Sequence, residues 1–377
     1  MQDALHAALL PQGLHDLLPP DAGHEAVIVE RALASITAHG YERVKPPLVE
    51  YEAGLLAGVG AADRDRIFRL LDPVTQRTMA VRADLTPQIA RIAAVRLAHA
   101  PRPLRLAYTG EVLRVVGDQL RPERQFRQVG CELIGSLEPT ADAEIIALAA
   151  ETALGIGITG LTVDLALPTL VPALLEAHGI TGAARAELET ALDRRDASVL
   201  AARGDEVGRM LADLVNLAGP VDSALKQFAS LALPASAEPD RARLFAVVAQ
   251  LRGRVPAVPL TIDPVERRGF EFQTGLSFTL FARGVRGELG RGGRYRVAAS
   301  NEPAVGVTLF SDSLLRALPP PARTLRVFVP VGGDAAKLRE QGWITVAALG
   351  PVDDARAEAK RLGCTHVWID AAVSEIA

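Results

Sequence analysis

Three positions spaced two residues apart, Gln128, Gly130 and Glu132, could together bind a small polar molecule. In an extended strand they face the same side, because successive side chains alternate between the two faces of a sheet. Gly130 has no side chain, so it leaves a gap between an amide and a carboxylate. A small ligand could lie in that gap, although a solvated sheet face with a glycine bulge would have the same sequence pattern.

These positions belong to a predicted hairpin that covers residues 104–136. Its two halves, LRLAYTGEVLR and QFRQVGCELIGS, have a period of two and are joined by a ten-residue connection. The second half places Phe126 on the same face as Gln128 and Glu132. The first half places five residues on one face: Leu104, Leu106, Tyr108, Val112 and Arg114. We therefore predict a long antiparallel hairpin with polar groups directed to one side.

A second candidate for ligand binding is a predicted strand-to-helix corner at Asp84 and Thr86. Thr86 is expected to be the N-cap of a helix with Pro87 at its first position, so Asp84 ends the preceding strand. The N-terminus of a helix presents backbone N–H groups to a ligand. Helix capping alone would also explain both side chains.

The N-terminal part of the chain is predicted to contain one helix and two extended regions. Residues 24–40 are amphipathic at helical spacing and end at a glycine. The segment YERVKPPLVEY follows, and its Pro46 and Pro47 restrict it to a sheet edge or to an interface between protomers. Residues 66–82 are expected to form a hairpin that turns at Asp72 and Pro73.

A helical insert and a small terminal domain are predicted further along the chain. Residues 168–256 consist of helix-favouring segments separated by glycine and proline, and strands return after them. The glycine-rich GRGGRY is a weak phosphate signal, because it lacks the strand and helix of a dinucleotide loop. Three prolines, 319–321, indicate a linker. We expect an α+β domain at 1–320 and a small α/β domain with a βαβαβ pattern at 324–377.

Composition excludes several classes of protein. The 377-residue chain has a formal net charge of −4, so it lacks the basic field that is typical of nucleic-acid binding. Its two cysteines, Cys131 and Cys364, have no zinc-ligand spacing, which predicts a reducing compartment and no structural metal. No signal peptide and no apolar run long enough to span a membrane are found. We expect a cytoplasmic protein without a cofactor.

Together these motifs resemble the core of a class II aminoacyl-tRNA synthetase, and most closely that of histidyl-tRNA synthetase. The helix and proline strand ending at Pro47 resemble motif 1, the dimer segment, and the hairpin at 104–136 resembles motif 2. RQFRQVGCELIG is similar to the histidine-binding strand, and RRGFEFQTG to the histidyl-specific arginine and paired-tyrosine motif. The resemblance implies an antiparallel sheet flanked by helices, with a helical insert and a shortened anticodon-binding domain at the C-terminus.

The resemblance also implies a histidine pocket. Glu132 and Gln128 correspond to the residues that recognise the imidazole, and Asp84 and Thr86 to those that contact the ammonium group. Arg114 or Arg268 corresponds to the contact with the carboxylate. Two further pocket positions stand where the family has tyrosines: Phe272 and Gln273.

Departures from the synthetase pattern affect nucleotide handling. The Gly-x-Glu-Arg pattern of motif 3 is absent, and Phe310, Asp312 and Ser313 stand there. A hydroxyl cannot replace a guanidinium that pairs with triphosphate. RVVGD also follows where the synthetases have a His-Glu pair after the motif 2 arginine. The terminal domain has no net charge, which removes the term that dominates tRNA affinity. We expect no adenylation and no nucleic-acid partner.

A synthetase-like chain with these losses resembles the regulatory subunits of ATP phosphoribosyltransferase. This resemblance implies a non-catalytic chain that activates a short-form catalytic subunit at the first step of histidine biosynthesis and binds histidine as feedback inhibitor. It also implies a dimer through the motif 1 region and no membrane partner. Two alternatives remain from the sequence: an active histidyl-tRNA synthetase with an unusual motif 3, and a paralogue that recognises another amino acid or a tRNA-like target.

Overall fold

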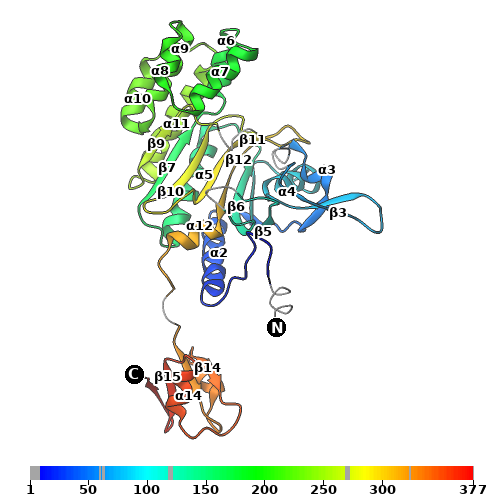
Figure 1. Cartoon of the computed structure of the whole chain (residues 1–377), viewed down its shortest axis with the longest axis vertical. Coiled ribbons are helices and arrows are strands. Elements are labelled where there is room, and N and C mark those ends of the chain that lie inside the picture. Colours follow the sequence, from blue (N-terminus) through cyan, green and yellow to red (C-terminus); the bar gives the residue numbers. More distant parts are fainter. Residues whose placement is uncertain are drawn as a thin grey trace. The chain divides into compact units, whose positions relative to one another are not determined.

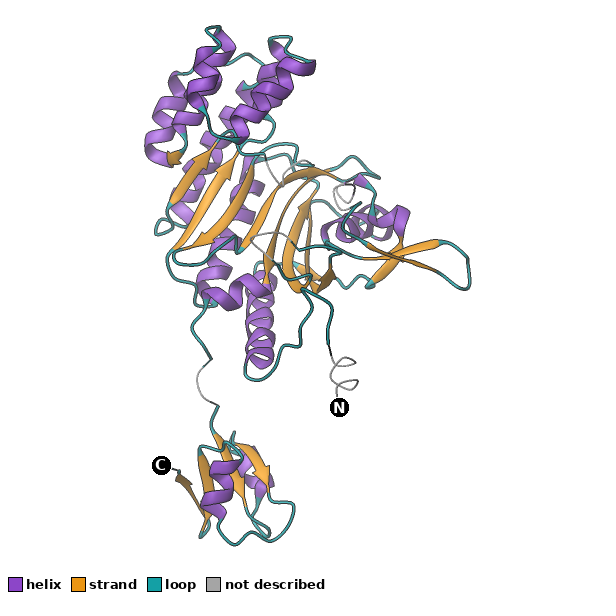
Figure 2. Cartoon of the chain, viewed as in Figure 1, coloured by secondary structure: helices purple, strands orange, loops and turns teal. Residues whose placement is uncertain are grey.

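The computed structural model describes residues 9–58, 61, 64–117, 122–267, 272–321 and 324–376. Contacts divide the chain into two compact units, Met1–Pro319 and Pro320–Ala377. The boundary falls within the run of three prolines. Figure 1 labels the elements of each unit, and Figure 2 shows that both contain helices and strands.

The main sheet of the larger unit has the strand order β1-β5-β6-β12-β11-β10-β7-β9-β8 within the described residues. Most neighbours are antiparallel, whereas β1 pairs with β5 and β7 with β9 in parallel. The predicted hairpin is confirmed as β5 and β6, with Tyr108 opposite Gly130. The strands are β1 Glu42–Arg43, β5 Leu104–Leu113, β6 Gln125–Ile134, β7 Leu161–Ala166, β8 Gly219–Pro220, β9 Leu260–Asp263, β10 Ser277–Ala282, β11 Gly290–Arg296 and β12 Pro303–Phe310.

The two faces of this sheet have different apolar clusters. Val129 and Cys131 of β6 join the large core, together with buried residues of α2, α5 and α11. On the other face, Tyr108 and Phe126 join a smaller cluster with residues of α4. The period of two predicted for the hairpin is therefore confirmed, and Gln128 and the other candidate positions of β6 lie on the face with the smaller cluster. The helices outside the insert are α2 Asp21–Ala38, α3 Glu52–Leu55, α4 Thr86–Arg91 with a following π-helical turn Ile92–Arg96, α5 Pro139–Gly155 and α12 Ser311–Ala317.

The helical insert lies between β7 and β9, as predicted. Its helices are α6 Leu170–Ala177, α7 Gly182–Asp193, α8 Ala197–Ala202, α9 Glu206–Leu217, α10 Val221–Ser230 and α11 Glu238–Arg254. Helix α11 is tied to α5 by Arg243, which donates to Asp142 Oδ2 at 2.8 Å. Arg294 of β11 donates to both oxygens of the same carboxylate, at 2.7 and 2.8 Å. Asp142 and Arg294 are almost fully buried, so this cluster fixes the insert and β11 on α5.

A small sheet with the order β2-β4-β3 carries the hairpin predicted at residues 66–82. Asp72 accepts hydrogen bonds from Val74 N and Thr75 Oγ1, as expected for the turn. Pro46 and Pro47 lie between β1 and β2, outside any strand, which agrees with their missing N–H donors. The strands are β2 Val49–Tyr51, β3 Phe68–Leu71 and β4 Thr78–Val81.

The smaller unit contains the predicted βαβαβ pattern and one further strand. Strands β13, β14 and β15 are parallel, and β16 adds to β15 in the antiparallel direction. Strand β16 was not predicted from the sequence, because it has only four residues and follows β15 after a two-residue turn. The elements are β13 Arg326–Val329, α13 Ala335–Glu340, β14 Ile344–Ala347, α14 Ala355–Arg361, β15 His366–Ile369 and β16 Ala372–Glu375.

Candidate functional site

The centre of the candidate site is the buried carboxylate of Glu132, whose residue is 2% exposed. Tyr108 Oη donates to Glu132 Oε1 at 3.1 Å, and Tyr295 Oη donates to Glu132 Oε2 at 3.0 Å. Burial raises the pKa of Glu132 to about 8, although hydrogen bonds from Tyr295 and Tyr108 act in the opposite direction. Without a ligand, the carboxyl group is therefore largely protonated at neutral pH.

Two glycines make room for these polar side chains. A Cβ atom at Gly130 would lie 2.7 Å from Tyr108 Oη, and one at Gly306 would overlap Glu132 Oε2. The gap predicted above Gly130 is therefore filled by the ring of Tyr108, because Tyr108 lies directly opposite Gly130 in the hairpin. The prediction that a ligand could lie directly on Gly130 is wrong, and Tyr108 forms part of the site wall.

Gln128 connects β6 to the strand-to-helix corner. Its Nε2 donates to Asp84 Oδ2 at 2.9 Å, and its Oε1 accepts from Leu85 N at 3.0 Å. Gln128 is fully buried, whereas Asp84 and Thr86 are half-buried. The structure thus brings together two candidate sites that lie more than 40 residues apart in the sequence.

The prediction that Thr86 is the N-cap of the helix is wrong. Helix α4 begins at Thr86, and the preceding residue, Leu85, makes no side-chain cap. Asp84 performs the capping instead, because its Oδ1 accepts from Thr86 N at 2.8 Å. A short aspartate side chain readily reaches the backbone N–H two residues ahead, as in an Asx-turn. The Thr86 hydroxyl acts as a hydrogen-bond partner of Glu132 and lowers the pKa of that carboxyl.

Arg114 lies next to the same corner, a position that the period of the hairpin did not predict. It is almost fully buried, and its Nε donates to Ala83 O at 3.4 Å. Its guanidinium lies 5.0 Å from the centre of the Phe126 ring. Arg114 is thus adjacent in space to the residue that precedes Asp84.

The remaining predicted positions belong to the segment that leads into β10. Arg268 lies outside the described residues, whereas Phe272 and Gln273 are half-buried. Phe272 packs against the cluster that contains Tyr108 and Tyr295. A Cβ at Gly293 would lie 2.8 Å from Gln273 Oε1, and Gly293 pairs with Gly306 beneath the Glu132 carboxylate. Gln273 and Glu132 therefore cover neighbouring strands of the same sheet face.

Arg82 also contacts the site, at strand β5, and was not predicted from the sequence. Its guanidinium lies over Gly110, where a Cβ would overlap Nη2. Its Nε donates to Glu111 O at 2.7 Å, and its Nη1 donates to Pro46 O at 3.2 Å. Gly110 lies opposite Gln128, so a third glycine on the polar face was the available signal. The hydrogen bond from Tyr295 to Glu132 was also not predicted from the sequence.

Comparisons with known proteins identify the family. Residues 13–314 match the family model described as Histidyl-tRNA synthetase. A protein of Rhodospirillum centenum is 53% identical over 98% of this chain and 96% of its own, and one of Paramagnetospirillum magneticum is 51% identical over 97% of each. Both are named ATP phosphoribosyltransferase regulatory subunit. The chain belongs to the ATP phosphoribosyltransferase regulatory subunit family.

Both relatives are named for a regulatory role, and a solved structure shares the fold of this chain. A solved structure described as an ATP phosphoribosyltransferase regulatory subunit/histidyl-tRNA synthetase from Bacillus halodurans superimposes with a TM-score of 0.80. It is 24% identical in sequence and covers 94% of this chain and 96% of its own, which shows the shared fold. The predicted α+β, class II synthetase-like fold is therefore confirmed.

The positions corresponding to motif 3 have structural contacts of their own. Phe310 is buried and packs edge-on against Phe126, with ring centres 5.9 Å apart. Ser313 accepts a hydrogen bond from Arg316 at 3.0 Å. Among the described residues, no group of three or more His, Cys, Asp or Glu side chains could hold a metal ion. No helix in the described ranges is both long and apolar enough to cross a bilayer.

Proposed function

We propose that this chain is the non-catalytic regulatory subunit of an ATP phosphoribosyltransferase and acts in the cytoplasm at the first step of histidine biosynthesis. It activates a short-form catalytic subunit and senses histidine for feedback inhibition. The observation that carries this proposal is the near full-length similarity to regulatory subunits at 53% and 51% identity. The buried polar site around Glu132 supports the sensing role.

Glu132 and Gln128 recognise the imidazole of histidine in this proposal. The support is that both lie on one sheet face and are almost fully buried. A buried carboxyl group becomes a strong partner when a ligand supplies an N–H donor or a proton, because electrostatic interactions strengthen in a low dielectric. Because its pKa is raised, Glu132 can either accept a hydrogen bond or take up a proton from the ligand near neutral pH.

The corner residues recognise the amino-acid backbone. Asp84 and Thr86 bind the ammonium group in this proposal, and both residues are half-buried at the N-terminus of α4. Arg114 or Arg268 binds the carboxylate, and a guanidinium pairs with it in two parallel hydrogen bonds. Phe272, which packs against the cluster that contains Leu85 and Tyr108, and Gln273 complete the pocket in this proposal.

Feedback requires that histidine bind two states of the assembly with different affinity. In our proposal the chain also self-associates as a dimer through the motif 1 region. Leu48 supports this, because it is an apolar residue that is 48% exposed between Pro47 and strand β2. Nucleic acid and membranes are not partners in this proposal.

The test combines this chain with a short-form ATP phosphoribosyltransferase catalytic subunit. We expect co-purification, higher transferase activity in the complex and inhibition of that activity by histidine. The variant Asp84→Asn should weaken inhibition without abolishing activation. Its matched control is Glu111→Gln on the face of the β5–β6 hairpin that points away from Gln128, where Glu111 pairs with Arg127 at 2.9 Å. Absence of any effect on the partner, or histidine-dependent ATP–pyrophosphate exchange by the chain alone, would refute the proposal.

A further inference from the structure

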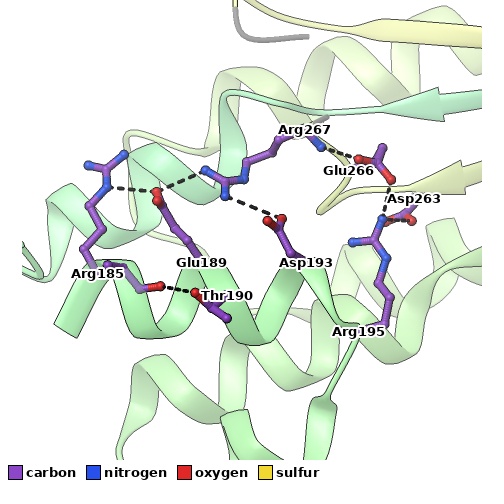
Figure 3. Close-up of polar contacts among 9 residues, drawn as sticks. Arg185, Glu189, Thr190, Asp193, Arg195, Asp263, Glu266 and Arg267 are labelled. Atoms are coloured by element: carbon purple, nitrogen blue, oxygen red, sulfur yellow. Dashed lines mark hydrogen bonds and ion pairs between the residues drawn. The ribbon is translucent and has the colours of Figure 1, made fainter. Parts of the chain in front are cut away.

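Ion pairs join the helical insert to the segment that follows β9 (Figure 3). Arg195, just beyond α7, contacts Asp263 Oδ2 at 2.5 Å and Glu266 Oε2 at 2.7 Å. From the same segment, Arg267 Nη1 donates to Glu189 Oε1 of α7 at 3.0 Å. The other end of the Arg267 guanidinium lies 3.9 Å from Asp193. Two arginines therefore link the insert and the segment in opposite directions.

The segment is also ordered internally by the same acids. Asp263 Oδ1 accepts from Val265 N at 3.2 Å, and Glu266 Oε1 accepts from Arg267 N at 2.9 Å. Each carboxylate thus holds a backbone N–H with one oxygen and Arg195 with the other. Loss of Arg195 would leave both carboxylates without a shared cation, so the backbone at 263–267 would lose a restraint.

The backbone conformation of Arg195 is a second indication that an arginine is required at this position. Its φ is +55°, a left-handed conformation that disfavours L side chains and is usually taken by glycine at the end of a helix. Such a residue persists where the surroundings require it, and it often indicates a functional constraint. The ion pairs of the side chain, and not a backbone preference of arginine, therefore account for an arginine at this position.

The segment connects this network to the candidate site. Asp263, Ser277, Gly293 and Gly306 lie in one row across the sheet, and Glu132 continues that row. The chain leaves the sheet at Asp263 on β9, and Gln273 lies over Gly293 on β11. Three strand spacings separate these strands, which is about 14 Å. The insert thus holds the chain at residues 263–267, and Phe272 and Gln273 of the proposed pocket follow a few positions later in the sequence. Residues 268–271, which join the two parts, lie outside the described residues.

We propose that Arg195 and Arg267 are positioning residues through which the helical insert sets the geometry of the histidine pocket, so that histidine binding and the position of the insert are energetically coupled. This proposal rests on the proposed function for its ligand. It assigns the insert a role in regulation: a partner that displaces α7 changes the affinity for histidine, and histidine changes the affinity for that partner by the same factor.

The test uses Arg195→Gly in the full chain. Glycine adopts the left-handed conformation with less strain, which offsets the loss of the two Arg195 ion pairs, so the melting temperature should change little. The dissociation constant for histidine should increase about 5- to 20-fold by calorimetry, within the usual range of coupling between sites. The matched control is Gln76→Gly, at the same φ of +55° in the β3–β4 turn, which should leave histidine affinity unchanged.

A measurement without histidine separates this inference from the proposed function. Hydrogen exchange of residues 260–267 and 272–276 should be faster in Arg195→Gly than in wild type and unchanged in Gln76→Gly. Unchanged hydrogen exchange at 272–276 in Arg195→Gly would overturn the inference. If wild type binds histidine, the same histidine affinity in Arg195→Gly would also overturn it. If wild type binds no histidine, the proposed function fails, and the exchange rates still decide whether the insert positions this wall.

Discussion

The buried carboxyl group of Glu132 should make the stability of the larger unit depend on pH. Its pKa is about 8 in the folded protein against a reference value of 4.5. Between these two values the unfolded chain has released the proton and the folded protein retains it. The free energy of unfolding therefore falls as pH rises, by about 1.4 kcal/mol per pH unit for this group. Over the whole range the loss is about 5 kcal/mol.

Glu132→Gln removes this titration and keeps the shape of the side chain. We expect the difference in unfolding free energy, variant minus wild type, to grow in favour of the variant from pH 5 to pH 8 and then to level off. Changes in the hydrogen bonds to Tyr108 and Tyr295 shift this difference by an amount that does not vary with pH over this range. The slope of the difference against pH is therefore the informative quantity. Urea titrations without ligand at several pH values measure it.

Circular dichroism is the suitable probe, because both tryptophans, Trp343 and Trp368, lie in the smaller unit and cannot report on the sheet that carries Glu132. Tyr295→Phe provides an internal control. It removes a hydrogen bond that lowers the pKa of Glu132, so stability should continue to fall above pH 8 in that variant. A difference between Glu132→Gln and wild type that stays constant from pH 5 to pH 8 would refute the reasoning.

Two further substitutions test the packing around the site. Gly306→Ala should destabilise the larger unit by about 1–3 kcal/mol in urea titrations, because the new Cβ overlaps the Glu132 carboxylate. Gly253→Ala in α11, where a Cβ meets nothing within 4 Å, should instead stabilise by about 0.5–1 kcal/mol. Asp142→Asn should destabilise by about 3–5 kcal/mol, because it leaves the buried Arg294 without its charge partner. The exposed Asp213→Asn on α9 is its control, and equal effects of the two would contradict a buried ion pair.

Much of the site was predictable from local patterns. The period of two along residues 104–136 predicted the hairpin and the common face of Gln128, Gly130 and Glu132. The Asp-Leu-Thr-Pro sequence predicted a helix start at Asp84 and Thr86. Both inferences depend on neighbours in sequence, where strand alternation and helix capping act directly.

Contacts between distant segments were not predictable from the same patterns. Tyr295 reaches Glu132 across 163 residues, and this requires that β12 and β11 add to β6 in one particular register. Arg82 lies over Gly110 because the corner folds back onto β5, which the sequence pattern does not indicate. The correction at Thr86 has a local cause: the Asp84 side chain competes successfully for the first N–H group of the helix.

The glycines beneath the polar side chains also limit how this pocket can change over evolution. A side chain added at Gly110, Gly130 or Gly306 would collide with Arg82, Tyr108 or Glu132, respectively. These three positions therefore cannot accept a larger residue unless the side chain above them moves. In the proposed histidine pocket, a change of ligand would then require substitutions at other positions, such as Phe272 and Gln273. Substitutions at those two positions could then change the ligand of the proposed pocket while the three glycines and the side chains above them stay the same.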